Sequence, residues 1–157
     1  MADSAYGAAL KMLARRELSE AQVRQRLARK QFPDQDIDEA LARLKTERAL
    51  DDDRVAAAIA RSETGLRKRG PLRVRQRLAA AGIAPGTAER ALDEIVSQVD
   101  MDALLVAALE KRLNGGTITD EREMARLFRQ LTGQGFESDR VMRLLRKHRA
   151  PRPPEST

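Results

Sequence analysis

Six cations between residues 67 and 77 form the densest group of side chains in this chain that could bind an anion. They flank a Gly70-Pro71 step, and they are Arg67, Lys68, Arg69, Arg73, Arg75 and Arg77. Because proline suits the first turn of a helix, the step predicts a basic loop followed by a helix start, an arrangement that can contact phosphate. The alternative is an exposed turn whose charge only keeps the protein soluble, and the pattern favours binding.

Two further arginines, Arg24 and Arg26, repeat part of this pattern earlier in the chain. The hexapeptide Val-Arg-Gln-Arg-Leu-Ala occurs at residues 23–28 and again at residues 74–79. On a helix, its arginines flank the stripe formed by valine and leucine, so they can reach solvent while their stems cover the edge of a core. They either contact an acidic protein surface or phosphate, or they form an ordinary solvated face, and the residues leave both open.

The aspartates at residues 51–53 and a C-terminal basic cluster are weaker candidates for a site. Asp51, Asp52 and Asp53 lack the spaced partners of a calcium loop, so we expect one to cap a helix and Asp52 or Asp53 to be available for a protein contact. Cations in the last turn of a helix ordinarily complement its dipole, which favours that role for the basic cluster. Its members are Arg143, Arg146, Lys147, Arg149 and Arg152, of which the first three are the candidates for a binding contact.

Nothing in the sequence predicts catalysis or a bound cofactor. His148 is the only histidine, there is no cysteine, and Gly115-Gly116 lacks the Lys-Ser/Thr of a phosphate loop. Phe32 and Phe136 stand at equivalent positions of a repeat where Ile83 also occurs, which indicates core packing rather than base stacking. We therefore expect no enzyme, no metal site and no nucleotide site.

The elements that would position the basic residues recur along the chain. The two hexapeptides are 51 residues apart, and the same offset pairs Leu41 with Leu92. Roughly doubling this offset gives a weaker third copy, in which Leu27 falls on Leu131 and polar identities are lost. Retention of apolar positions is typical of repeats that share a packing constraint, so the sequence predicts three tandem units.

Each unit carries the start and stop signals of three helices. We expect Ser19 to cap the second helix, Asp36 to cap the third, and Ser138 or Asp139 to cap the last. One of the aspartates at residues 51–53 caps the helix that follows them, and Asp120 starts another. With only 3% aromatic and 34% charged residues, thin-cored helical packing is favoured. The predicted fold is all-α, with about nine helices in three-helix repeats at residues 1–49, 50–99 and 100–150, followed by a disordered tail at residues 151–157.

Charge and hydropathy limit where the protein works. Its net charge of +6 arises from 30 basic and 24 acidic residues, a weak bias toward polyanionic partners. The start MADSAYGAAL lacks the basic flank and long apolar run of a signal peptide, and no stretch approaches the ~18 apolar residues that cross a bilayer. We expect a cytoplasmic protein without membrane contact.

The order of these units resembles the RecX family of bacterial recombination regulators over nearly the whole chain. The central segment LDDDRVAAAIARSETGLRKRGPLRVRQRLAAAGI carries most of the resemblance. The family-like elements are Leu18-Ser19 before a basic helix, Leu50 to Arg54, Gly70-Pro71 with Arg75 and Leu78, and Gly82-Ile83.

The resemblance implies an extended, curved protein that binds the RecA recombinase. Such a protein would lie in the groove of the RecA filament on single-stranded DNA and inhibit ATP hydrolysis and strand exchange, and with them recombination and the SOS response. It would be a monomer without a cofactor, and a direct contact with DNA stays open. The alternative is a stand-alone basic helical module that binds the DNA phosphate backbone. Because the third copy loses the hexapeptide arginines, we expect the first two repeats, and above all the basic turn before Val74, to carry more of the binding.

Overall fold

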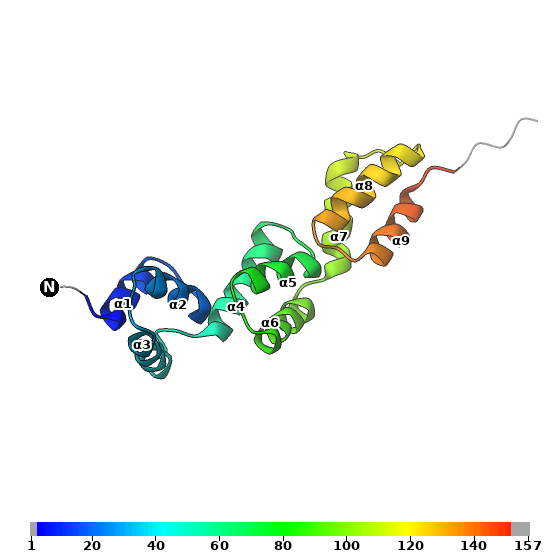
Figure 1. Cartoon of the computed structure of the whole chain (residues 1–157). Coiled ribbons are helices and arrows are strands. Elements are labelled where there is room, and N and C mark those ends of the chain that lie inside the picture. The colour runs from blue at the N-terminus through cyan, green and yellow to red at the C-terminus, as the bar shows by residue number, and fades with distance from the viewer. Residues whose placement is uncertain (1–2, 152–157) are drawn as a thin grey trace, which may run out of the picture.

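The computed structural model describes residues 3–151, and every regular element among them is helical (Figure 1). Of the predicted tail, residues 152–157 lie outside the described residues. The described part holds α1 (Ala5–Arg15), α2 (Glu20–Arg29), α3 (Asp34–Thr46), α4 (Asp52–Arg61), the π-helix η1 (Ser62–Leu66), α5 (Pro71–Ala80), α6 (Pro85–Gln98), α7 (Met101–Leu113), α8 (Glu121–Gly133) and α9 (Ser138–His148). The predicted fold class, an all-α array of three-helix repeats, is confirmed.

Each successive group of three α-helices encloses its own apolar core. Leu27, Leu78 and Leu131, the leucines that the repeat aligns, are all fully buried at equivalent places in the three cores. Leu50 packs in the core of the first unit and Met101 in that of the second, so neighbouring units interlock where they meet along the chain. The exact boundaries between repeats stay a prediction.

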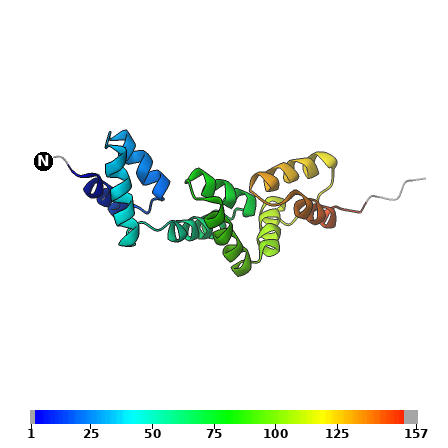
Figure 2. The same ribbon diagram turned by 60° about the horizontal axis from the view of Figure 1, so that its bottom comes forward.

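The three units follow one another in a row instead of folding back into one globule. Figures 1 and 2 show the same order from two directions, with α1–α3 at one end, α4–α6 in the middle and α7–α9 at the other end. Because each unit touches only its neighbours along the row, the shape depends on the two joints between units.

Local signals account for most helix ends. Ser19 and Gln22 form a capping box at α2, Asp51 accepts a hydrogen bond from the Arg54 backbone at α4, and Pro71 occupies the first turn of α5. Asp120 caps α8 in the same way.

Two predicted caps are wrong. The helix α3 already begins at Asp34 with Pro33 in the cap position, and α9 begins at Ser138 with Glu137 in that position. In both places the residue before the helix is extended and offers no side-chain hydrogen bond to it. Asp36 instead lies inside the first turn, where its charge still complements the positive end of the helix.

The joint between the second and third units is a close approach of two backbones. The N–H groups of Gly70 and Leu72, at the start of α5, donate to the carbonyl oxygens of Gln134 and Gly135, each at 3.0 Å. Gly135 has a φ of 107°, and a Cβ there would overlap the Cβ of Arg73. A side chain at this turn would therefore force the joint open.

The joint between the first and second units uses the equivalent surfaces. Ser19, which is 51 residues before Gly70, donates from its hydroxyl to the carbonyl of Ala81. Gly82 has a φ of 75°, and a Cβ there would lie 2.5 Å from the Cβ of Ala21. At the first joint the start of α2 packs on the turn after α5, and at the second joint the start of α5 packs on the turn after α8. In both joints the second helix of one unit therefore contacts the turn after the second helix of the next unit. The array is thus built head to tail by one repeated contact.

Candidate nucleic-acid and protein interface

The basic turn between α4 and α5 is organised by a buried carboxylate, Glu63 of η1. Its side chain is only 4% exposed, and three guanidinium Nε atoms surround its carboxylate oxygens, those of Arg69 and Arg77 at 3.4 Å and that of Arg67 at 3.8 Å. The Arg69 backbone N–H also donates to the Glu63 carbonyl oxygen, at 2.9 Å. One buried carboxylate therefore lies among three cations at ion-pair distance, although its Oε2 atom accepts no hydrogen bond from the described residues.

The charge of this cluster is not cancelled by Glu63. Three guanidinium groups against one carboxylate leave an excess of positive charge, and the side chains of Arg67 and Arg77 are 58% and 51% exposed. The carboxylate holds the arginines in place while their outer faces stay open to a partner. Sequence reasoning missed Glu63, although an acid four and six residues before two arginines of a basic run was a visible signal.

Lys68 and Arg73 are the cations of this turn without an ion pair among the residues that the structure describes. Lys68 is exposed, with a φ of 55°, and its carbonyl accepts a 2.6 Å hydrogen bond from the Gln134 side chain. Arg73 donates to the Gln76 side chain at 3.1 Å. Their backbones are tied to the chain, and their charges remain available to an anion.

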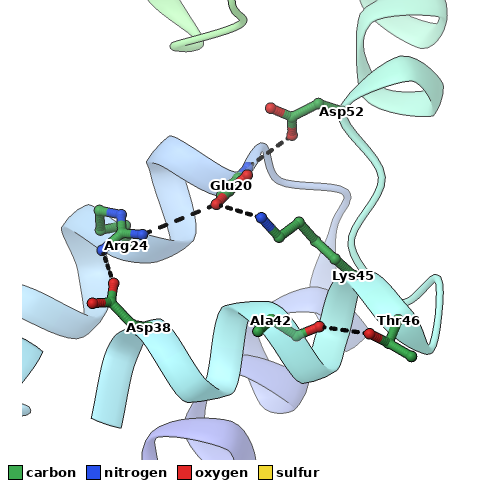
Figure 3. A network of polar contacts seen from close by, with 7 residues as sticks. All are labelled: Glu20, Arg24, Asp38, Ala42, Lys45, Thr46 and Asp52. Atoms are coloured by element: carbon green, nitrogen blue, oxygen red, sulfur yellow. Dashed lines mark hydrogen bonds and ion pairs between the residues drawn. The ribbon is translucent and has the colours of Figure 1, made fainter. Parts of the chain in front are cut away.

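The first arginine of each repeated hexapeptide is paired inside its own unit. Arg24 donates to Asp38 at 2.7 Å, and Arg75 donates to Glu89 at 2.8 Å, two acids that are also 51 residues apart. Figure 3 shows Arg24 reaching Asp38 on α3 and Glu20 on its own helix. The hydrogen bond to Glu89 raises the pKa of Arg75 above its ordinary value. These pairs tie the second helix of a unit to the third, which explains why the arginine recurs.

The second arginine of each hexapeptide is used differently. Arg77 joins the group around Glu63, whereas Arg26 is exposed and makes no ion pair within residues 3–151. The repeated Arg-Gln-Arg pattern therefore combines one structural arginine with one that faces outward.

The aspartates at the start of α4 serve contacts within the chain. Asp51 is the cap of α4, and Asp53 pairs with Arg90 at 3.1 Å. Asp52 accepts a 2.8 Å hydrogen bond from the Glu20 backbone N–H and so links the first and second units (Figure 3). Burial raises the pKa of Asp52, although the hydrogen bond from Glu20 opposes this effect.

Replacing Asp52 with asparagine is expected to change how stability depends on pH. The folded-state pKa of Asp52 is raised. The protonated side chain therefore contributes to the stability of the fold below the pKa of an unfolded aspartate, and this contribution is lost as the pH rises through the folded pKa. The asparagine side chain would keep an acceptor for Glu20 without a charge to desolvate. Urea unfolding should therefore show that the free energy of unfolding of D52N rises relative to that of the wild type between acid and neutral pH. The rise should be less than about 1 kcal/mol because the site is partly hydrated. A constant difference across pH would contradict this assignment.

The C-terminal basic residues do not form one cluster. Arg143 and Lys147 face the α7 side of the third unit, beside Asp102, while Arg146 faces the α8 side, beside Glu121. The cations of α9 lie in its last turns, as the helix dipole favours. The candidate site is therefore centred on the basic turn rather than on α9.

A groove of about 920 Å³ opens between the second and third units, next to the basic turn. Arg67, Lys68 and Arg69 line one side of it, and Lys111 and Arg112 of α7 line it from the third unit. The remaining lining residues are Leu66, Leu104, Ala107, Ala108, Gln130, Gly133 and Gln134. Sequence reasoning did not single out Lys111 or Arg112, because they are distant from the basic turn in sequence and only the fold brings them to it.

Other kinds of site find no support in the part of the chain that the structure describes. Residues 3–151 contain no group of three or more histidine, cysteine or acidic side chains that could hold a metal ion. Among the same residues, no helix has the length and apolar character needed to cross a membrane.

Comparisons with known proteins agree with the architecture. Residues 5–44 match the family model of the first three-helix domain of RecX, and residues 51–92 match that of the second. The crystal structure of RecX from Lactobacillus salivarius superposes with a TM-score of 0.72 at 22% identity, covering 91% of this chain and 93% of that one. At that identity the structural likeness shows the fold.

Similarity in sequence extends across most of the chain. The regulatory protein RecX of Halorhodospira halophila is 35% identical over 134 residues, which cover 85% of this chain and 81% of that protein. The regulatory protein RecX of Ectopseudomonas mendocina is 33% identical over 141 residues, covering 88% and 91%. With both three-helix domains matched and the similarity covering most of the chain, this protein belongs to the RecX family of regulatory proteins.

Proposed function

We propose that this protein binds RecA and RecA filaments on single-stranded DNA, and that it inhibits RecA ATPase, strand exchange and the recombination and SOS activity that depend on them. The observation that carries the proposal is the head-to-tail array of three similar units joined by one repeated contact. A row of related surfaces suits a partner that is itself a repeating polymer, since successive units can bind successive protomers. The protein acts as a cytoplasmic monomer and needs no cofactor.

Six of the predicted residues are the stronger candidates for the partner surface. Arg24 and Arg75 are paired with acids of their own units, so they serve mainly the structure of the repeat. Asp52 and Asp53 are likewise occupied by contacts within the chain. The candidates with charge to offer are Arg26, Arg67, Lys68, Arg69, Arg73 and Arg77.

The direct test is the effect of the purified protein on RecA from the same organism. ATP hydrolysis stimulated by single-stranded DNA should fall as the protein is added, and light scattering should report a change in the filaments. RecA activity that is unaffected at a molar excess of this protein would overturn the proposal.

Reversing the charges of Lys68 and Arg73 together should weaken inhibition of RecA ATPase at least tenfold. Neither side chain has an ion pair to lose within the described residues, so Lys68→Glu with Arg73→Glu should leave the thermal unfolding midpoint nearly unchanged. The matched control reverses Arg122 and Arg126, two exposed cations of α8 outside the basic turn. Equal loss in both double variants would show that net charge, not this surface, governs inhibition.

A stand-alone module that binds the DNA backbone is the second candidate, favoured by the excess of cations around the groove. Binding through phosphates weakens steeply with salt. Inhibition of RecA that persists at a salt concentration abolishing binding to naked DNA would favour protein contacts. Inhibition that disappears together with DNA binding, in a protein that does not bind RecA in the absence of DNA, would favour the module.

A further inference from the structure

We propose that the groove between the second and third units binds the backbone of a single-stranded nucleic acid. The proposal rests on the proposed function and deepens it, because it names which part of a nucleoprotein filament the groove takes and which residues take it. It also brings in the third unit, whose copy of the hexapeptide has lost its arginines.

The lining of the groove is strongly cationic. Five cations line the groove and no carboxylate does, among the side chains that the structure describes. Lys68, Lys111 and Arg112 form no ion pair with any residue of the described part. Arg67 and Arg69 share the single charge of Glu63 with Arg77, which lies outside the lining. Cations collected in a concave surface raise the local concentration of an anionic ligand far more than the same charges spread over a convex one.

The groove is already formed in the free protein. Its two sides belong to different units, and the joint holds them through the Gly70 and Leu72 hydrogen bonds to the α8–α9 turn. The Gln134 side chain adds a bond to the Lys68 carbonyl, directly at the groove. A ligand therefore does not have to assemble the cationic surface, which lowers the cost of binding.

The hydrogen-bonding groups of the lining suit a nucleic acid better than an acidic peptide. The five charged side chains of the lining supply N–H donors only, and the side-chain acceptors that a peptide backbone would also need are limited to the amide oxygens of Gln130 and Gln134. A phosphate backbone presents acceptors only, and arginine matches its geometry. A nucleic acid thus uses this lining more fully than an acidic protein segment does.

The apolar part of the lining favours a single strand and little sequence preference. The cations are separated by an apolar surface that includes Leu104, Ala107 and Ala108, and Leu66 stands beside it with 83% of its surface exposed. The faces of unstacked bases can cover such a surface, and a duplex does not offer them because its bases are stacked on one another. No aromatic ring is among the described lining residues, so base stacking contributes less here than in proteins that stack bases on aromatic side chains.

The test measures binding of a fluorescein-labelled oligothymidylate by anisotropy, without RecA. Lys111→Gln combined with Arg112→Gln should weaken binding at least tenfold at low salt. Removal of two phosphate contacts should also reduce the slope of log K against log salt by about 1.4, at about 0.7 for each contact on a single strand. The control, Arg122→Gln with Arg126→Gln on α8, removes the same charge outside the groove and should bind like the wild type.

The other outcomes of this binding experiment either overturn the groove proposal or separate it from the proposed function. Unchanged affinity and slope in the groove variant, or equal losses in groove and control variants, would overturn the proposal. A groove variant that binds oligothymidylate normally but no longer inhibits RecA would show that the groove takes a protein segment instead, which also overturns it. A wild-type protein that leaves RecA unaffected, yet binds oligothymidylate through Lys111 and Arg112, would refute the proposed function. It would still support binding of a single strand in the groove.

Discussion

Gly70→Ala is expected to break the joint between the second and third units and to lower the free energy of unfolding by about 2–4 kcal/mol. A Cβ at this position would lie 2.5 Å from the carbonyl carbon and oxygen of Gly135 and 2.6 Å from the backbone nitrogen of Phe136. All three are backbone atoms, so no side-chain rotation relieves the overlap. The two backbone segments must therefore separate, and the hydrogen bonds that the Gly70 and Leu72 N–H groups donate to the α8–α9 turn are lost.

Urea unfolding followed by circular dichroism measures this effect, with Gly133→Ala as the matched control. A Cβ at Gly133 meets nothing within 4 Å, and alanine is the better helix former, so the control should be neutral or slightly stabilising. If the two units fold separately once the joint is open, the Gly70 variant will show two transitions in place of one. Identical curves for the two variants would mean that the joint contributes nothing to stability.

The same variant links the joint to the groove. Separation of the two units would move Lys111 and Arg112 away from the basic turn, because the two sides of the groove belong to different units. Binding of oligothymidylate should therefore fall in the Gly70 variant although none of the cations has been changed. Stability and binding depend here on one backbone contact.

The repeat was predictable from the sequence because its signal is local and apolar. Leu27, Leu78 and Leu131 recur where each unit needs a side chain at the centre of its core, and the structure buries all three. Capping residues such as Ser19 and Asp51 act on backbone groups a few residues away, so they too are visible in the sequence. The caps of α3 and α9 were missed because no side chain performs them.

The candidate site was predictable only in part. The basic turn is contiguous in sequence, but Lys111 and Arg112 join it through a joint made of backbone groups, which carries no side-chain signature. The pairing of Arg24 with Asp38, in contrast, had a signal: the equivalent Arg75 faces Glu89 at the same offset. An acid that recurs at the same offset as an arginine is a sign that the two form an ion pair within each repeat, so such an arginine is less available to a partner.

Glu63→Gln is expected to destabilise the protein by about 1–3 kcal/mol. Loss of one partner from a buried ionic group costs about 3–5 kcal/mol, and the exposure of Arg67 and Arg77 reduces that figure here. Glutamine keeps the shape of glutamate but not its charge, so three guanidinium groups would be left near one another without the anion between them. Their repulsion should loosen the turn that links η1 to α5.

The control for this variant is Glu89→Gln, which removes the partner of Arg75 in an ion pair whose two side chains are 49% and 51% exposed. Such a pair contributes about 0–1 kcal/mol, so its loss should be small. Added phosphate should restore part of the stability lost in the Glu63 variant, since an anion from solution can bind the exposed sides of Arg67 and Arg77 and reduce their repulsion, whereas it should not rescue the Glu89 variant. Equal destabilisation of the two variants, with no difference between phosphate and chloride, would show that Glu63 does not hold the basic turn together.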